Sequence, residues 1–294
     1  MLISAEQLAT RLEAPGWVIV DCRHELARPE AGRAAFGEGH IPGAHFLHLD
    51  DDLSAPRTGH NGRHPLPDPL VLARRLEAIG IGSTTQVVVY DAQGGMMASR
   101  LWWLLRWLGH DAVAVLDGGL PQWQSRGMPL TRETTQPGRG QLVVQLREWV
   151  VDAASVLANL ATASATTTAA LSTAPLAPFT LIDARAPDRF RGENETLDPV
   201  AGHVPGARNH PFAGNLDASG CFRPADELRQ RWQATLGATP ASRAVHMCGS
   251  GVSACHNLLA LEVAGLPGGR LYAGSWSEWC SDRQRPVAQG SEGA

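Results

Sequence analysis

The chain has 294 residues, of which 25 are basic and 29 acidic, so its formal net charge is −4. This balance predicts no electrostatic footprint for nucleic acid, and the apolar runs are far shorter than the roughly 20 residues that cross a bilayer. No basic start followed by an unbroken apolar segment opens the chain. We therefore expect no signal peptide and a soluble, cytoplasmic protein that has neither nucleic acid nor a membrane as its partner.

Every basic residue is an arginine, because the sequence contains no lysine. This excludes lysine Schiff-base chemistry and a P-loop lysine. The sequence contains five widely spaced cysteines: Cys22, Cys221, Cys248, Cys255 and Cys280. An odd number of scattered cysteines without a CxxC pair argues against a disulfide framework and against a structural zinc site.

Strand and helix patterns alternate along the first half of the chain. A helix is predicted over residues 5–12 and β-branched strands over 18–21 and 87–90. Apolar residues then recur at helical spacing over 98–108, and a further strand is predicted over 113–116. This alternation predicts an α/β domain with a central, mostly parallel sheet and helices on both faces. Active sites in such domains lie at the carboxyl ends of the strands.

Four landmarks of the first half return in the same order in the second half. VIVDCR at 18–23 matches LIDAR at 181–185, and GHIPGA at 39–44 matches GHVPGA at 202–207. VVVYD at 87–91 aligns with AVHMC at 244–248, and DGGLPQW at 117–123 aligns with AGSWSEW at 273–279. The order and spacing predict a tandem duplication.

The predicted domains are residues 1–135 and 141–294. They are joined by the polar segment 131–140, which contains proline and glycine. A segment rich in alanine, threonine and serine, residues 161–178, is predicted to be a surface insertion without a chemical role.

One cysteine lies where a strand leads into a loop of small residues and then a helix. The strand predicted over 243–247 runs into the sequence CGSGVS at 248–253, and a helix is predicted over 254–263. Glycines let backbone N–H groups converge on an anion, and a helix N-terminus adds its positive dipole end, so the loop should favour a thiolate. The aligned position of the first half is Asp91. We therefore predict that Cys248 is the catalytic nucleophile, whereas the alternative is a buried, inert thiol.

With these landmarks the chain resembles the tandem-domain rhodanese and 3-mercaptopyruvate sulfurtransferases along almost its whole length. The resemblance is carried by the Asp-x-Arg strand end, GH(I/V)PGA in both halves and the CGSGVSA loop. It implies two rhodanese-like domains, an inactive N-terminal one and an active C-terminal one, and a persulfide on Cys248. This persulfide would take sulfane sulfur from a small anionic donor and pass it to a thiol, to cyanide or to a thioredoxin-like protein. We expect a monomer that uses no cofactor and no metal.

The resemblance also implies which residues hold the donor. An arginine six residues after the strand-end aspartate binds the anionic donor in the family, and that position is Arg189. A guanidinium suits a carboxylate or a thiosulfonate through paired hydrogen bonds. The loop residues expected to contribute to donor binding are Gly249, Ser250, Gly251, Val252 and Ser253.

Two departures from the family bear on the choice of donor. Animal mercaptopyruvate enzymes carry a second donor-binding arginine, and residues 193–199 contain none. Thiosulfate-type enzymes place basic residues directly after the cysteine, where this chain has Gly249 and Ser250. The loop therefore favours 3-mercaptopyruvate, and thiosulfate is the alternative donor.

Asp50 and His64 resemble family residues that work with the loop serine, Ser250, in proton transfer. A histidine can deliver or remove a proton near neutral pH. The alternative is that this polar segment is a solvated loop.

Two other functions compete with sulfur transfer. Cysteine phosphatases use a C-x5-R loop, but the position of the required arginine is Ala254, so a phosphate would lack its guanidinium clamp. A rhodanese-like binding or regulatory module without activity is the other alternative, and the intact loop at Cys248 argues against it.

Overall fold

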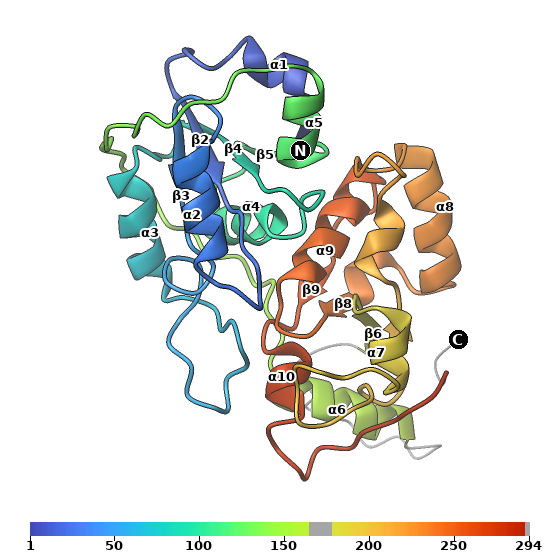
Figure 1. Ribbon diagram of the computed structural model, residues 1–294. Coiled ribbons are helices and arrows are strands. Elements are labelled where there is room, and N and C mark those ends of the chain that lie inside the picture. The colour runs from blue at the N-terminus through green and yellow to red at the C-terminus, as the bar shows by residue number, and fades with distance from the viewer. Residues whose placement is uncertain (165–177, 292–294) are drawn as a thin grey trace. The chain divides into compact units, whose positions relative to one another are not determined.

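The computed structural model describes residues 1–164 and 178–291, which form two compact α/β units (Figure 1). Unit 1 comprises Met1–Pro56, Leu66–Glu148 and Leu216–Arg223. Unit 2 comprises the described residues of Arg57–Pro65, Trp149–Asn215 and Pro224–Ala294. Of the predicted insertion at 161–178, residues 165–177 lie outside the described residues.

Unit 1 is built on a parallel sheet of five strands in the order β1-β5-β4-β2-β3. The strands are β1 (Leu2–Ile3), β2 (Trp17–Asp21), β3 (Ala44–Phe46), β4 (Gln86–Tyr90) and β5 (Val113–Leu116). The helices are α1 (Ala5–Ala9), α2 (Ala31–Glu38), α3 (Pro69–Ala78), α4 (Ala98–Trp107) and α5 (Gly119–Ser125). The valine-rich β4 is buried on both faces after its first residue, as expected for the centre of a parallel sheet.

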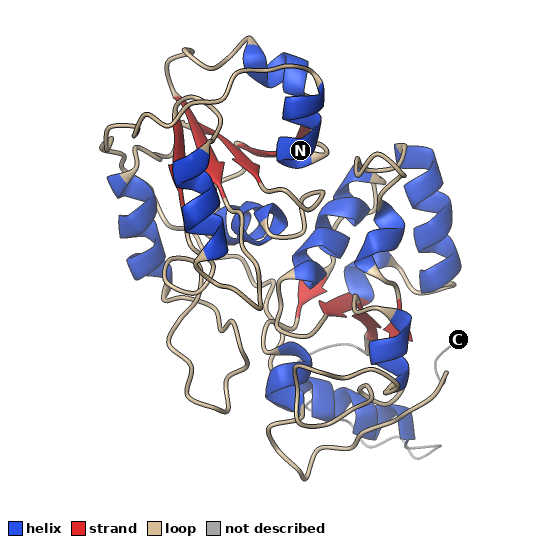
Figure 2. Cartoon of the chain, in the orientation of Figure 1, coloured by secondary structure: helices blue, strands red, loops and turns tan. Residues whose placement is uncertain are grey.

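The strand order explains why helices cover both faces of this sheet (Figure 2). The chain moves outward from β2 to β3 and then returns through β4 to β5. Because parallel crossovers are right-handed, the outward connection through α2 and the return connections through α3 and α4 lie on opposite faces.

Unit 2 repeats this topology with a parallel sheet in the order β7-β6-β8-β9. The strands are β6 (Thr180–Asp183), β7 (Arg208–Asn209), β8 (Ala244–Met247) and β9 (Arg270–Leu271). The α-helices are α6 (Ala153–Ser164), α7 (Pro187–Arg191), α8 (Ala225–Leu236), α9 (Ser253–Val263) and α10 (Ser275–Trp279), and the 3-10 helices are η1 (Phe212–Asn215) and η2 (Ala241–Arg243). A parallel bridge between Val150 and Leu271 takes the place that β1 has beside β5. The predicted duplication is therefore present in the topology of both units.

The same turn stabilises both copies. His40 Nδ1 bonds the Phe36 carbonyl at 2.8 Å, and His203 Nδ1 bonds the Phe190 carbonyl at 2.8 Å. Each imidazole also stacks on that phenylalanine, with ring centroids 3.8 Å apart. These histidines are parts of the fold, because the copy with Asp91 at the cysteine position has the same arrangement as the copy with Cys248.

Most predicted elements are confirmed, and one is shorter than expected. The helices predicted over 98–108 and 254–263 and the strand predicted over 113–116 are α4, α9 and β5. The helix predicted over 5–12 ends at Ala9, and the hydroxyl of Thr10 donates a hydrogen bond back to the Gln7 carbonyl at 2.8 Å. A threonine that bonds the last turn in this way competes with continued helix.

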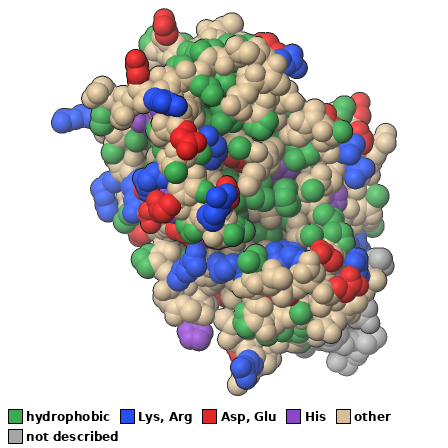
Figure 3. Space-filling model, viewed as in Figure 1, with side chains coloured by type: hydrophobic (Ala, Val, Ile, Leu, Met, Phe, Trp, Pro, Cys, Tyr) green, Lys and Arg blue, Asp and Glu red, His purple; other side chains and the backbone are tan. Residues whose placement is uncertain are grey.

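None of the helices in residues 1–164 and 178–291 is long and apolar enough to cross a membrane. On the face shown in Figure 3, both arginine and acidic side chains lie at the surface. This surface agrees with the small formal net charge of −4.

Candidate active site

The proposed nucleophile lies in unit 2, at the carboxyl end of β8. Cys248 follows Met247 directly and is 2 % exposed. Residues 248–253, which we call the nucleophile loop, lead into α9 at Ser253. Within the loop, the Gly251 N–H points at Cys248 Sγ with an N–S distance of 3.1 Å. The backbone therefore directs a donor at the sulfur, as an anionic thiolate requires.

Gly251 is required by the shape of the loop. Its φ of +78° belongs to the left-handed region, which residues with a Cβ rarely adopt. A Cβ atom at this position would lie 2.4 Å from the Ala273 carbonyl oxygen. The second glycine of the CGSG motif thus allows the loop to pack tightly against the segment that precedes α10.

Three hydrogen bonds tie the nucleophile loop to the start of α10. The Cys248 N–H donates to Ser275 Oγ at 3.1 Å, and the Cys248 carbonyl accepts from the Trp276 N–H at 3.0 Å. The Gly249 carbonyl accepts from the Ser277 N–H at 2.9 Å. Sequence reasoning missed Ser275, although the alignment of AGSW with DGGL was the signal that could have identified it.

Unit 1 shows what the same loop does when a carboxylate replaces the thiol. Asp91 follows β4, and its Oδ1 accepts the N–H groups of Gln93 and Gly95 at 2.8 and 2.9 Å. Its Oδ2 accepts those of Met97 and Ala98 at 2.7 and 2.9 Å. Four backbone donors, three from the loop after β4 and one from the first residue of α4, thus surround one carboxyl group, which is the arrangement of an anion-binding nest. The loop after β4 therefore surrounds a carboxyl group with N–H donors at the position that aligns with Cys248, which follows β8 in unit 2.

His64 and Ser250 lie together in unit 2. The segment 57–65 belongs to this unit although it comes from the first half of the chain. His64 Nδ1 is 2.7 Å from Ser250 Oγ, and the two residues are 2 % and 5 % exposed. An imidazole bonded to a hydroxyl can pass a proton through it.

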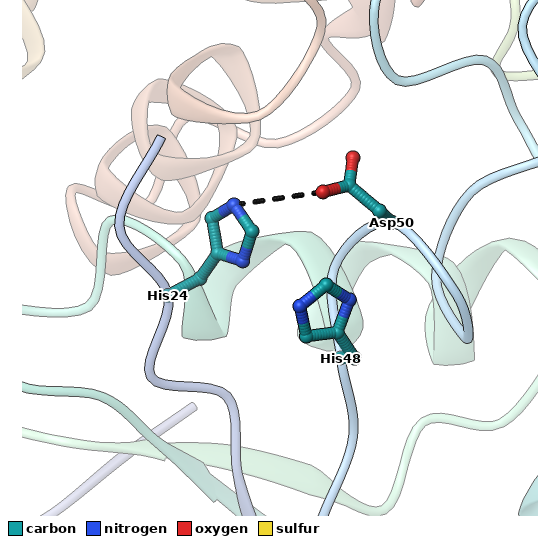
Figure 4. Close-up of side chains that lie close together, drawn as sticks. All are labelled: His24, His48 and Asp50. Carbon is teal, nitrogen blue, oxygen red and sulfur yellow. Dashed lines mark ion pairs between the residues drawn. The ribbon is translucent and has the colours of Figure 1, made fainter. Parts of the chain in front are cut away.

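Asp50 lies in unit 1, where the structure pairs it with a different histidine. Its Oδ2 is 3.9 Å from His24 Nε2. His48 lies beside them, with its ring 5.1 Å from that of His24 in an edge-on arrangement (Figure 4). The structure thus groups His64 with Ser250 and groups Asp50 with His24 and His48.

The ligating atoms of His24, His48 and Asp50 lie within 4.8 Å of one another, a spacing compatible with a metal. However, His48 Nε2 is 3.0 Å from the Pro29 carbonyl oxygen, and His48 Nδ1 accepts from the Asp51 N–H at 3.3 Å. This hydrogen-bonding pattern engages both ring nitrogens of His48, so we infer no metal site here.

Arg189 faces the nucleophile loop and is held by a buried carboxylate. Its Nη2 bonds both oxygens of Glu195, at 2.8 and 2.9 Å. A built Cβ on Gly249 would lie 3.6 Å from Arg189 Nη1. Arg185 extends this network, because it bonds Asp183 and also reaches Glu195 at 3.4 Å.

A second arginine, Arg63, reaches the same glycine, and sequence reasoning missed it. Its Nη2 is 2.7 Å from the built Cβ position of Gly249, and its Nη1 pairs with Asp198. Its partners Asp198 and Gly249 are 135 and 186 residues away along the chain, so no local pattern links Arg63 to the site. In the sequence, its position next to His64 was the signal that could have identified it.

The pKa values of two carboxyl groups beside these arginines are shifted in opposite directions. Burial raises the pKa of Asp198, and the adjacent Arg63 only partly offsets this. Burial also opposes ionisation of Glu195, but the Leu197 N–H and Arg189 outweigh it, so the pKa of Glu195 is lowered. Carboxyl groups whose pKa values are pushed apart in one cluster are typical of functional sites.

Comparison with known proteins agrees with this geometry. The family model described as "Rhodanese-like domain" matches residues 4–126 and 165–282. The chain is 48 % identical to a Pseudomonas aeruginosa protein named "Probable 3-mercaptopyruvate sulfurtransferase", over 98 % of each chain. It is 31 % identical to a thiosulfate sulfurtransferase of Gallus gallus, over 95 % of this chain and 92 % of the relative.

A solved structure gives the same result. The 3-mercaptopyruvate sulfurtransferase from Leishmania major superposes with a TM-score of 0.82 at 26 % identity, over 98 % of this chain and 76 % of that one. The family model matches two domains of the chain, and the relatives align with nearly its whole length. The chain belongs to the tandem-domain rhodanese family of sulfurtransferases.

Proposed function

We propose that this protein transfers sulfur from 3-mercaptopyruvate through a persulfide on Cys248. The observation that carries the proposal is the nucleophile loop: a thiol with a backbone N–H directed at its sulfur, beside two arginines. Unit 2 is the catalytic unit, and unit 1, with Asp91 in the equivalent loop, is the inactive copy.

The first half of the reaction follows from these groups. The Cys248 thiolate attacks the sulfur of the donor, and the bond between that sulfur and the donor's methylene carbon breaks. The electron pair of this bond remains on the organic fragment as the enolate of pyruvate, which takes up a proton and leaves as pyruvate. The Gly251 N–H stabilises the charge on the Cys248 sulfur, and Arg189 holds the donor carboxylate.

His64 and Ser250 would supply that proton. The 2.7 Å contact between His64 Nδ1 and Ser250 Oγ forms a relay that ends in the nucleophile loop. The role of Asp50, which lies in unit 1 beside His24, stays a prediction. Gly249, Gly251, Val252 and Ser253 shape the donor pocket as the backbone of the loop.

The second half of the reaction returns the enzyme to its starting state. An acceptor thiolate, or cyanide, attacks the outer sulfur of the persulfide. The S–S bond breaks, and Cys248 leaves as a thiolate. We propose a small thiol or a thioredoxin-like protein as the physiological acceptor.

Thiosulfate is the alternative donor, and the Gallus gallus relative is named for it. The uncharged residues Gly249 and Ser250 after the cysteine weigh against it, because a dianion gains from cations at those positions. The test is thiocyanate formation with each donor. We expect a higher kcat/KM with 3-mercaptopyruvate, and a higher value with thiosulfate would reverse the assignment.

We propose that the protein acts as a monomer in the cytoplasm. None of the five cysteines, all of which are among the described residues, forms a disulfide bond, which suits a reducing compartment. Light scattering and cell fractionation test these two statements. A dimer, or enrichment in an oxidising compartment, would contradict them.

A further inference from the structure

Two guanidinium groups flank the residue that follows the nucleophile. A Cβ atom placed on Gly249 would lie 2.7 Å from Arg63 Nη2 and 3.6 Å from Arg189 Nη1. Their side chains are 21 % and 20 % exposed, so both keep an accessible edge. Although residues 193–199 contain no arginine, a second cation therefore stands beside the loop, supplied by an earlier segment of the chain.

Arg63 is fixed to the nucleophile loop through one serine. The Arg63 N–H donates to Ser277 Oγ at 3.0 Å, and the Ser277 N–H donates to the Gly249 carbonyl at 2.9 Å. Because both bonds involve backbone groups, the position of Arg63 is coupled to that of the loop. The guanidinium of Arg63 is held separately, because its Nη1 pairs with Asp198, and a cation held in place binds an anion with less loss of side-chain freedom than a mobile one.

The two arginines are matched by two carboxylates. The side chains of Glu195 and Asp198 are only 1 % and 3 % exposed. Glu195 bonds Arg189, whereas Asp198 pairs with Arg63 and lies 3.5 Å from Arg189 Nη2. With both carboxylates ionised, this cluster has cations to orient a donor but no net formal charge.

We infer that Arg63 is the second donor-binding cation and that Asp198 makes the site prefer a singly charged donor over a doubly charged one. This inference rests on the proposed function, since it concerns the donor of the same reaction. The carboxylate of a 2-oxo acid needs one guanidinium partner and meets a neutral cluster. Thiosulfate carries a second negative charge, which the buried carboxylate of Asp198 repels.

The first test replaces Asp198 by its neutral isostere. Asp198→Asn should raise the ratio of kcat/KM for thiosulfate to that for 3-mercaptopyruvate by about tenfold, because removing a nearby negative charge favours the dianion more. Asp282→Asn is the matched control. Asp282 lines the same cavity of about 770 Å³ as Asp198 but is 45 % exposed and pairs with Arg285. An unchanged or lower ratio in Asp198→Asn overturns the role of Asp198.

The second test addresses Arg63. Arg63→Gln should raise KM for both donors about tenfold or more with a smaller change in kcat, because a charge-assisted contact to the bound anion is lost. Arg63→Lys should recover part of the loss. Arg283→Gln, which changes another arginine of the same cavity, should leave KM unaltered. Wild-type KM values in Arg63→Gln would show that Arg63 does not hold the donor.

Binding measurements keep the test valid if a variant turns over poorly. The affinities of 3-mercaptopyruvate and thiosulfate are measured by calorimetry in the Cys248→Ser background, with and without Asp198→Asn, after circular dichroism has established folding. The same shift toward thiosulfate is expected, and its absence contradicts the inference. Failure of the proposed function looks different, because wild-type protein would then form no persulfide with either donor.

Discussion

Ser275 holds the nucleophile loop at a strained position. It has a φ of 55°, and among the described residues it is the one non-glycine residue with positive φ. Its hydroxyl accepts the Cys248 N–H and donates to the Tyr272 carbonyl at 2.9 Å. Unit 1 has Gly119 at the aligned position, with a φ of 60°. Strain retained beside a nucleophile points to a positioning role.

Two substitutions of Ser275 separate strain from hydrogen bonding. Ser275→Ala loses both hydrogen bonds and keeps the strain, so we expect a loss of about 1–2 kcal/mol in the free energy of unfolding. Ser275→Gly also relieves roughly 1 kcal/mol of strain and should be more stable than Ser275→Ala. Both substitutions should lower kcat to a similar extent. They should also lower the rate of persulfide formation in a single-turnover experiment. Wild-type kcat in either variant would remove Ser275 from the positioning of Cys248.

His64 should matter for one donor and not for the other. Pyruvate enolate must be protonated on carbon, whereas sulfite leaves thiosulfate without such a step. His64→Gln should therefore lower kcat with 3-mercaptopyruvate by about 100-fold, the size of a general-acid contribution. Turnover of thiosulfate should change much less. Equal losses with both donors would assign His64 to loop structure, and the comparison needs only steady-state rates at saturating acceptor.

At the scale of elements, the two glycines of the nucleophile loop have different tasks. Gly251→Ala would bring a Cβ to 2.4 Å from a backbone oxygen, so we expect loss of activity and at least about 3 kcal/mol of destabilisation. Gly249→Ala would bring a Cβ to 2.7 Å from Arg63 Nη2 and 3.6 Å from Arg189 Nη1, which are side-chain ends and not backbone, so it should chiefly raise the donor KM. Gly206→Ala, with a φ of +73° and open space around it, measures the effect of positive φ alone. Urea unfolding and steady-state kinetics compare the three, and equal stability of Gly251→Ala and Gly206→Ala would contradict the clash.

Sequence patterns predicted the elements because each element is determined locally. The valine run of β4 and the helical spacing in α4 are properties of contiguous residues, and so is the order strand, glycine loop, helix around Cys248. Arg63 could not be found in this way, because its partners lie 135 and 186 residues further along the chain. The role expected for Ser250 required His64 to fold into unit 2, and only the tertiary structure gives that contact.

At the scale of the whole molecule, two buried histidines in unit 2 make stability depend on pH. Burial lowers the pKa of His210 to about 4 and that of His246 to about 3. The unfolded chain, with an ordinary histidine pKa of about 6.5, binds more protons than the folded one as the pH falls below that value. Stability contributed by the neutral histidines is therefore present at pH 7 and is lost progressively toward pH 4.

His246→Leu tests this linkage. Both ring nitrogens of His246 are buried without a hydrogen-bond partner among the described residues, so an apolar side chain of similar size should be tolerated. Between pH 7 and pH 5 the wild-type free energy of unfolding should fall about 2 kcal/mol further than that of His246→Leu. Denaturant titrations at the two pH values measure the difference. Parallel losses in the two proteins would mean that His246 is not neutral in the folded state.

The central claim is that Cys248 carries sulfur as a persulfide. The most direct measurement is intact-protein and peptide mass spectrometry after brief incubation with 3-mercaptopyruvate and removal of excess donor. We predict the added mass of one sulfur atom on the peptide that contains Cys248, its loss when an acceptor thiol is added, and its absence from Cys248→Ser. Sulfur on another cysteine, or turnover to thiocyanate by Cys248→Ser, would contradict the account.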